Sequence, residues 1–272
     1  MRIHGQAFAE RAGANRLTPM PARKYHGSEV VLVQYMIIAK TVEQQFLYRD
    51  TLMVDAVVHF PQLAGPDSDG IDDINTYYRQ RAASLIGYAE ETLYPAAVEQ
   101  YRNAQMNGYP FNHYILLQTF EITCRSSLLS LYSDIYEYTG GAHGLTTRTS
   151  ETWKVDEGRR LELGDLFVEG YDYMGVIIPA IEAEAARRQA AGEAEYFDDL
   201  PANIRRYFDE ENYYLTPAGL VIYYPLYTIA PYVSGIQAFT IPYGLLVRNR
   251  PPGPPPATEA EIPWQSAEPA VP

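Results

Sequence analysis

The stretch SSLLSLYSDIYEYTGGAHGLTTRTSETWKV, residues 126–155, decides the fold class because it places three glycines between two segments of alternating polar and apolar residues. In a glycine-rich phosphate loop, a helix follows directly, and its first amide groups and dipole hold the anion. Here the residues after Gly144 are β-branched and alternating, which is typical of a strand. The stretch therefore predicts a β-hairpin whose connection is built on Gly140, Gly141 and Gly144, with no phosphate site.

Two helical patterns lie among further strand-like segments. The apolar residues of the first recur every three or four positions: Ile74, Tyr78, Ala82, Leu85, Ala89, Leu93 and Ala97. Asp72 or Asp73 is the expected N-cap, and Pro95 is expected to kink this helix. The second helix is expected from Asp172 to Ala191. Because helices and strands alternate irregularly, we predict an α+β fold of antiparallel sheet with meandering strands, on which one long and one shorter helix pack.

Four parts are expected along the chain: a flexible N-terminal arm (1–26), a first half of strands plus the long helix (27–110), a second half of strands, helix and strands (111–249), and a tail (250–272). The tail holds eight of the 20 prolines and predicts an extended, unpacked segment. It would serve as a linker or as a peptide ligand for an aromatic groove.

The composition is that of a globular protein, with 272 residues, 47% apolar and 20% charged. A net charge of −13 argues against nucleic acid and anionic membranes, whereas it would attract a basic protein. Solubility alone also explains an acidic chain. The 24 tyrosines suit a binding surface, or simply half-buried strands.

No segment is apolar and long enough for membrane insertion, and the N-terminal residues do not read as a signal peptide. The chain as written is therefore expected to be unanchored, either cytoplasmic or an exported domain. The single cysteine, Cys124, ends an alternating segment and is expected to be a buried, inert thiol.

Catalytic and metal-binding patterns are scarce. The five histidines, at positions 4, 26, 59, 113 and 143, form no ligand pair, and DSDGIDD (67–73) lacks the spacing of a calcium loop, so we expect no metal and no cofactor. One enzymatic interpretation stays open: a glycan- or peptide-acting hydrolase with His143 as general base and Asp165 orienting it.

Several motifs resemble a known two-part module. VVHFPQLAGPDSDGIDDIN (57–75) is similar to the strand, turn and helix start of its first half. Its second half is similar to GGAHG (140–144), LELGDLF (161–167), YYLTPAGLVIYYPLYTIAPYVSG (213–235) and FTIPYGLL (239–246). The module is the extracytoplasmic domain-of-unknown-function pair of RsiV-type lysozyme-sensing anti-sigma factors, which also accompanies the catalytic domain of PdaC-type peptidoglycan deacetylases. The likeness covers residues 27 to 247.

The resemblance implies an α+β fold, a location outside the cytoplasm and, in one branch, binding of lysozyme, a basic protein. The sigma-binding segment and membrane helix of those sensors have no counterpart in this chain as written. The same holds for the separate metal-dependent domain of those deacetylases. Neither anti-sigma activity nor deacetylation is therefore expected to carry over.

These observations favour a secreted or envelope-located, non-catalytic recognition domain that binds a lysozyme-like basic protein or peptidoglycan. The expected ligand contacts are Gly140, Gly141, His143, Gly144, Tyr227, Pro231 and Tyr232. Rigid aromatic residues provide contact area at low entropic cost. Two alternatives remain: a buried strand connection at residues 227–235 held by Pro231 and Gly235, and a structural module of an envelope assembly.

Overall fold

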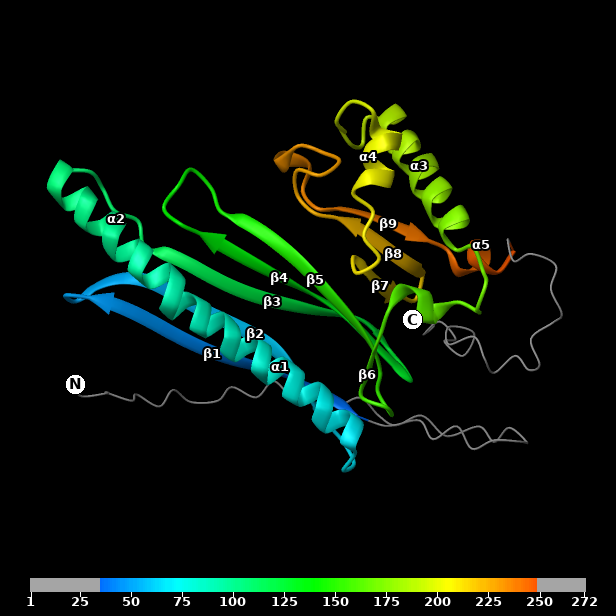
Figure 1. Ribbon diagram of the computed structural model, residues 1–272, viewed down its shortest axis with the longest axis horizontal. Helices are drawn as coiled ribbons and strands as arrows, with labels where there is room; N and C mark the ends of the chain where they lie inside the picture. The colour runs from blue at the N-terminus through cyan, green and yellow to red at the C-terminus, as the bar shows by residue number, and fades with distance from the viewer. Residues whose placement is uncertain (1–34, 249–272) are drawn as a thin grey trace. The chain divides into compact units, whose positions relative to one another are not determined.

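The computed structural model describes residues 35–248, which contain two β-sheets and the helices packed on them (Figure 1). The expected arm (1–26) and tail (250–272) lie outside the described residues. The larger sheet has the strand order β1 (Met36–Tyr48), β2 (Thr51–Ala64), β3 (Tyr114–Arg125), β4 (Leu128–Tyr138), β5 (Leu145–Lys154) and β6 (Arg159–Leu161). The smaller sheet has the order β7 (Tyr213–Thr216), β8 (Gly219–Tyr224) and β9 (Gln237–Ile241).

The helices divide between the two sheets. The segments that follow β2 are α1 (Asp69–Tyr88), a π-helical turn η1 (Ala89–Leu93) and α2 (Tyr94–Asn107). Those that follow β6 are η2 (Leu163–Leu166), α3 (Met174–Ala190), α4 (Leu200–Arg206), η3 (Tyr232–Ser234) and α5 (Tyr243–Arg248). The predicted α+β class is confirmed. None of the described helices is long and apolar enough to cross a membrane.

Neighbouring strands pair antiparallel, with one exception. β2 and β3 are parallel, because the helical segment from Asp69 to Asn107 returns the chain to the same end of the sheet. The larger sheet thus includes strands from both sides of the boundary expected between residues 110 and 111.

Four hairpins, β1–β2, β3–β4, β4–β5 and β5–β6, set the register of the larger sheet, and two of them bear on the sequence predictions. β4 pairs with β5 from Leu128↔Lys154 to Glu137↔Leu145, which confirms the hairpin predicted around the three glycines. The β1–β2 turn consists of Arg49 and Asp50, which both have positive φ, 49° and 63°. Such a turn usually contains glycine or asparagine, so the sequence offered no signal for it.

Helix α1 covers one face of the larger sheet. Ile74, Tyr78 and Ala82 are almost fully buried in a cluster with Leu131 and Trp153 of β4 and β5. The helix begins one turn earlier than the pattern predicted: Ser68 is the N-cap, instead of Asp72 or Asp73.

The carboxylates of Asp69 and Asp72 lie in the first turn of α1, where the helix dipole favours negative charge. At the other end of α1, the π-helical turn η1 precedes Pro95, which has no amide proton for the α-helical hydrogen bond.

The smaller sheet packs on the opposite face of the larger one. On that face, the ring of Tyr132 lies 5.1 Å from that of Tyr214, and the Leu215 amide donates to the Ser130 hydroxyl at 2.9 Å. The other side of the smaller sheet is covered by α3 and α4, with Ile177, Ile181 and Ile204 fully buried.

Arg148 of β5 strengthens the contact between the sheets. It donates two hydrogen bonds to Asp134, at 2.7 and 2.6 Å, and its guanidinium lies 3.7 Å from the centre of the Tyr132 ring. A bidentate ion pair stacked on an aromatic ring uses both the planar shape and the charge of arginine. Arg148 therefore fixes Tyr132 where the smaller sheet packs.

Candidate functional site

The β4–β5 connection, residues 139–144, needs glycine at two positions. Gly140 has a φ of +83°, which side-chain-bearing residues rarely adopt. Gly144 is buried, and a Cβ atom there would lie 2.5 Å from the Glu137 carbonyl oxygen and the Tyr136 ring. These two glycines hold the connection tightly against its own strands and leave His143 exposed.

The β8–β9 connection approaches His143 from the smaller sheet. The rings of His143 and Tyr232 are stacked, with centroids 4.3 Å apart and an interplanar angle of 24°. Tyr227 lies on Tyr232 in turn, at 5.5 Å and 27°. We call these three residues the aromatic stack. The two segments singled out in the sequence, GGAHG and YTIAPYVSG, therefore form one surface.

One backbone carbonyl holds the stack together. The Gly144 oxygen accepts the hydroxyl of Tyr232 at 2.9 Å, and it lies 2.9 Å from Nδ1 of His143. Both contacts are polar and both end on the same buried glycine. The relative positions of His143 and Tyr232 are therefore fixed by backbone geometry in addition to ring stacking.

The segment 227–235 combines buried anchors with exposed side chains. Ile229 and Ala230 are buried in the core beneath the smaller sheet, whereas Tyr227 is 51% and Val233 87% exposed. Pro231 supplies the N-cap of the short helix η3. The middle of the segment is thus core and its two flanks are surface, and ligand contact at the flanks stays a prediction.

Tyr227 has an unusual backbone conformation. Its φ is +65°, in the left-handed region that non-glycine residues seldom occupy. Such conformations cost about 1–3 kcal/mol and persist where the surrounding structure enforces them. Tyr227 lies in a turn that is closed by a hydrogen bond from the Thr228 amide to the Pro225 carbonyl, at 3.3 Å.

The residues of the hydrolase interpretation do not meet. Asp165 lies in η2, and its carboxylate accepts hydrogen bonds from Arg159 at 2.8 Å and from the Glu162 amide at 3.0 Å. η2 follows β6, which pairs with the far end of β5 from His143. At about 3.3 Å per residue, the intervening part of β5 separates them by more than about 20 Å.

Within residues 35–248, no carboxylate bonds to the ring of His143, so no base–acid pair is assembled there. The same residues contain no group of three or more His, Cys, Asp or Glu side chains that could hold a metal ion.

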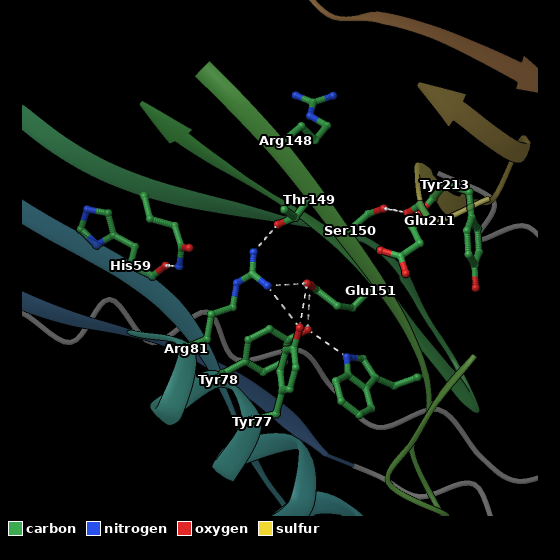
Figure 2. A network of polar contacts seen from close by, with 12 residues as sticks. His59, Tyr77, Tyr78, Arg81, Arg148, Thr149, Ser150, Glu151, Glu211 and Tyr213 are labelled. Carbon is green, nitrogen blue, oxygen red and sulfur yellow. Dashed lines mark hydrogen bonds and ion pairs between the residues drawn. The ribbon is translucent and has the colours of Figure 1, made fainter. Parts of the chain in front are cut away.

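A buried polar network, which sequence reasoning missed, lies between α1 and β5 (Figure 2). Glu151 is only 3% exposed. Its carboxylate accepts hydrogen bonds from Tyr77 at 3.2 Å and Tyr78 at 3.4 Å, and forms an ion pair with Arg81 at 3.3 Å. Burial raises the pKa of Glu151, and the nearby Arg81 partly offsets that effect.

The network is enclosed by packing. The Trp153 indole donates to the Tyr78 hydroxyl at 2.9 Å, and Arg81 donates to the Thr149 hydroxyl at 2.6 Å. Glu151 is in phase with Thr149 and Trp153 along β5, and that alternation was the available signal for its burial. Because every partner comes from α1 or β5, the network fixes the helix on the sheet, and we assign it a structural role.

Comparisons with known proteins identify two matched families, one in each part of the chain. The family described as "Deacetylase PdaC" matches residues 49–146, and the family described as "Protein of unknown function (DUF3298)" matches residues 164–244. His143 and Gly144 lie in the first match, whereas Tyr227 and Tyr232 lie in the second. The motif GGAHG, which the resemblance had assigned to the second half of the module, therefore belongs to the first, and from here on the two halves are these two matched ranges. No curated protein matched the chain.

The solved structures that are similar to the chain include two DUF3298 family proteins. A DUF3298 family member from Bacteroides fragilis has a TM-score of 0.59 and 19% identity, over 79% of this chain and 93% of that one. A DUF3298 family protein from Pseudomonas aeruginosa has a TM-score of 0.49 and 19% identity, over 81% and 95%. The first of these likenesses shows a shared fold.

Proposed function

We propose that this chain, which carries both halves of the PdaC–DUF3298 module, is a non-catalytic recognition domain that works outside the cytoplasm and binds a basic protein through its aromatic stack. The observation that carries the proposal is the exposed stack itself, to which both halves contribute. The location outside the cytoplasm and the lysozyme-like character of the ligand rest on the family resemblance.

The geometry of the stack favours binding. Tyr227 is half exposed, and its ring is held by stacking on Tyr232, which in turn is fixed by its hydrogen bond to Gly144. A tyrosine that is already ordered loses little conformational entropy when a ligand covers it. Val233, which follows Tyr232 in the chain and is 87% exposed, adds apolar surface next to the stack.

The charge of the chain favours a basic ligand. A net charge of −13 speeds encounter with a cationic protein and disfavours polyanions. The exposed face of a tyrosine ring also attracts lysine and arginine side chains. Charge and aromatic surface thus select the same class of partner.

Isothermal titration calorimetry of the purified chain against lysozyme, and separately against soluble peptidoglycan fragments, tests the proposal. We expect saturable binding of lysozyme and a loss of at least about tenfold in affinity for Tyr227→Ala, because central aromatic contacts dominate interfaces. Tyr109→Ala is the matched control, since Tyr109 is 68% exposed and lies beyond α2.

Three results would contradict the proposal: no heat with lysozyme, equal affinity of the Tyr227→Ala variant and wild type, or binding of peptidoglycan alone. Turnover of the fragments that is lost in a folded His143→Ala variant would instead establish the hydrolase alternative.

A further inference from the structure

A cavity of about 220 Å³ opens where β5 and β6 meet the segment that enters β7. None of the residues of the aromatic stack lines it. Figure 2 shows three of the lining residues, Ser150, Glu211 and Tyr213, close together at the edge of the polar network. This volume is several times that of a water molecule, so the cavity has room for a small organic group.

The floor of the cavity is apolar, and its polar atoms are already satisfied. Leu161, Leu163 and Tyr213 are buried. The Tyr213 hydroxyl donates to the Leu161 carbonyl at 2.8 Å, and the Ser150 hydroxyl donates to the Tyr213 carbonyl. Both hydroxyl protons at the floor are therefore already donated within the protein, and a ligand there would meet mainly hydrocarbon.

The rim, in contrast, is charged and open to ligands. Three carboxylates, of Glu162, Glu210 and Glu211, face one guanidinium, of Arg160, which leaves two net negative charges. Among the described residues, no ion pair joins Arg160 to any of the three. Glu210 accepts the hydroxyl of Tyr173 at 2.9 Å, and Glu162 accepts a backbone amide.

Each carboxylate has about four acceptor positions, so all three glutamates keep unused capacity. Glu211 in particular makes no side-chain hydrogen bond within residues 35–248. An acidic rim over an apolar floor is complementary to a cation on a hydrocarbon stem.

We propose that this cavity binds a primary ammonium group on an alkyl stem, with the stem on Leu161, Leu163 and Tyr213 and the ammonium group among the glutamates. The proposal is independent of the aromatic stack. A lysine side chain of a polypeptide and a free aliphatic diamine share this chemistry. Arg160 distinguishes a cationic ligand from an anionic or zwitterionic one, because its guanidinium would repel the first and attract the other two.

Ligand-observed NMR titration of the full chain tests the site with three probes: Nα-acetyl-lysine methylamide, its uncharged and one-atom-shorter analogue Nα-acetyl-norleucine methylamide, and cadaverine. We expect saturable binding of the lysine probe and at least about tenfold weaker binding of the norleucine probe. Tighter binding of the lysine probe than of cadaverine assigns the site to polypeptide side chains, and the reverse order assigns it to free diamines.

Charge variants locate the site. For Glu211→Gln, we expect the affinity for the lysine probe to fall about two- to fivefold, the range of partly exposed ion pairs, and to rise by a similar factor for Arg160→Gln. Glu162→Gln is the second acidic variant, in case Glu211→Gln does not fold. Glu169→Gln is the control, since Glu169 is exposed and lies outside the cavity.

The proposal is overturned if neither the lysine probe nor cadaverine binds saturably. It is also overturned if the norleucine probe binds as tightly as the lysine probe. Weaker binding by Arg160→Gln would also overturn it, because an anionic or zwitterionic ligand would then be indicated. A double Tyr227→Ala/Tyr232→Ala variant should bind the lysine probe as wild type does. Lysozyme binding by this variant therefore reports on the proposed function and lysine-probe binding reports on this site, so either proposal can fail without the other.

Discussion

Replacing Glu151 with alanine should destabilise the protein strongly, because it would leave buried partners without their acceptor. The carboxylate is 3% exposed and is shared by Tyr77, Tyr78 and Arg81. Removing one member of a buried ion pair costs about 3–5 kcal/mol. Because the Arg81 side chain is 25% exposed, water can partly solvate its charge in the variant, and we expect a cost at the lower end of this range.

For a domain of this size, each kcal/mol shifts the melting temperature by roughly 2–4 °C, so Glu151→Ala should melt about 6–12 °C below wild type. Differential scanning calorimetry at neutral pH measures the shift. Glu169→Ala is the control and should stay within about 0.5 kcal/mol of wild type, because Glu169 is exposed.

Glu151→Gln separates the charge from the hydrogen bonds and predicts a pH dependence. Burial raises the pKa of Glu151 in the folded state above its unfolded value. The stability that arises from this shift is therefore fully present below the unfolded pKa of about 4.3 and is lost as pH rises through the folded pKa.

The glutamine variant lacks this effect, so the advantage of wild type over Glu151→Gln should shrink between pH 4 and pH 8. The reasoning would be refuted by a melting-temperature drop below about 2 °C for Glu151→Ala, or by a wild-type advantage that grows with pH.

Three further predictions follow from local geometry. Gly144→Ala should cost about 1–3 kcal/mol in urea unfolding, because its Cβ would lie 2.5 Å from neighbouring atoms, whereas Gly141→Ala should be near neutral, with the nearest atom at 3.9 Å. Asn75→Ala should lower the free energy of unfolding by about 2 kcal/mol, because the buried side-chain amide of Asn75 hydrogen-bonds to both backbone groups of Leu63, at 2.7 and 2.9 Å. Asn75→Asp should not recover that stability, because a carboxylate cannot donate to the Leu63 carbonyl. Since burial raises the pKa of the Cys124 thiol, iodoacetamide at pH 8 should alkylate the folded protein more slowly than the urea-unfolded chain, as mass spectrometry can follow.

The sequence predicted what depends on local pattern. Alternation on both sides of the glycines at positions 140, 141 and 144 was enough to identify the β4–β5 hairpin, because side-chain period and turn chemistry are local properties. The parallel pairing of β2 with β3 was missed, because strand alternation does not encode which neighbour a strand takes. The charged residue Glu151 was passed over because a lone carboxylate in an alternating strand usually faces solvent.

The candidate site shows the same division. His143, Tyr227 and Tyr232 were each singled out from glycine, proline and aromatic content, but their stacking depends on a contact across about 90 residues of chain. No local pattern carries that information. Asp165 was paired with His143 by residue type alone, and the order of strands places it at the other end of β5.

If the proposed ligand binds the stack, the position of the stack links that binding to the contact between the two halves of the module. Gly144 belongs to the first half, and the Tyr232 hydroxyl that bonds to its carbonyl belongs to the second. A ligand that contacts both His143 and Tyr232 would bind the docked halves more tightly than separated ones, and it would stabilise that docking by at most RT ln(1 + [L]/Kd), about 2.7 kcal/mol at a hundredfold excess over Kd. Because linkage is reciprocal, a change that loosens the Tyr232–Gly144 contact weakens ligand binding to the extent that it populates the undocked state. A surface built in this way would report the presence of its ligand as a change in how firmly the halves are held together, without any chemistry at His143.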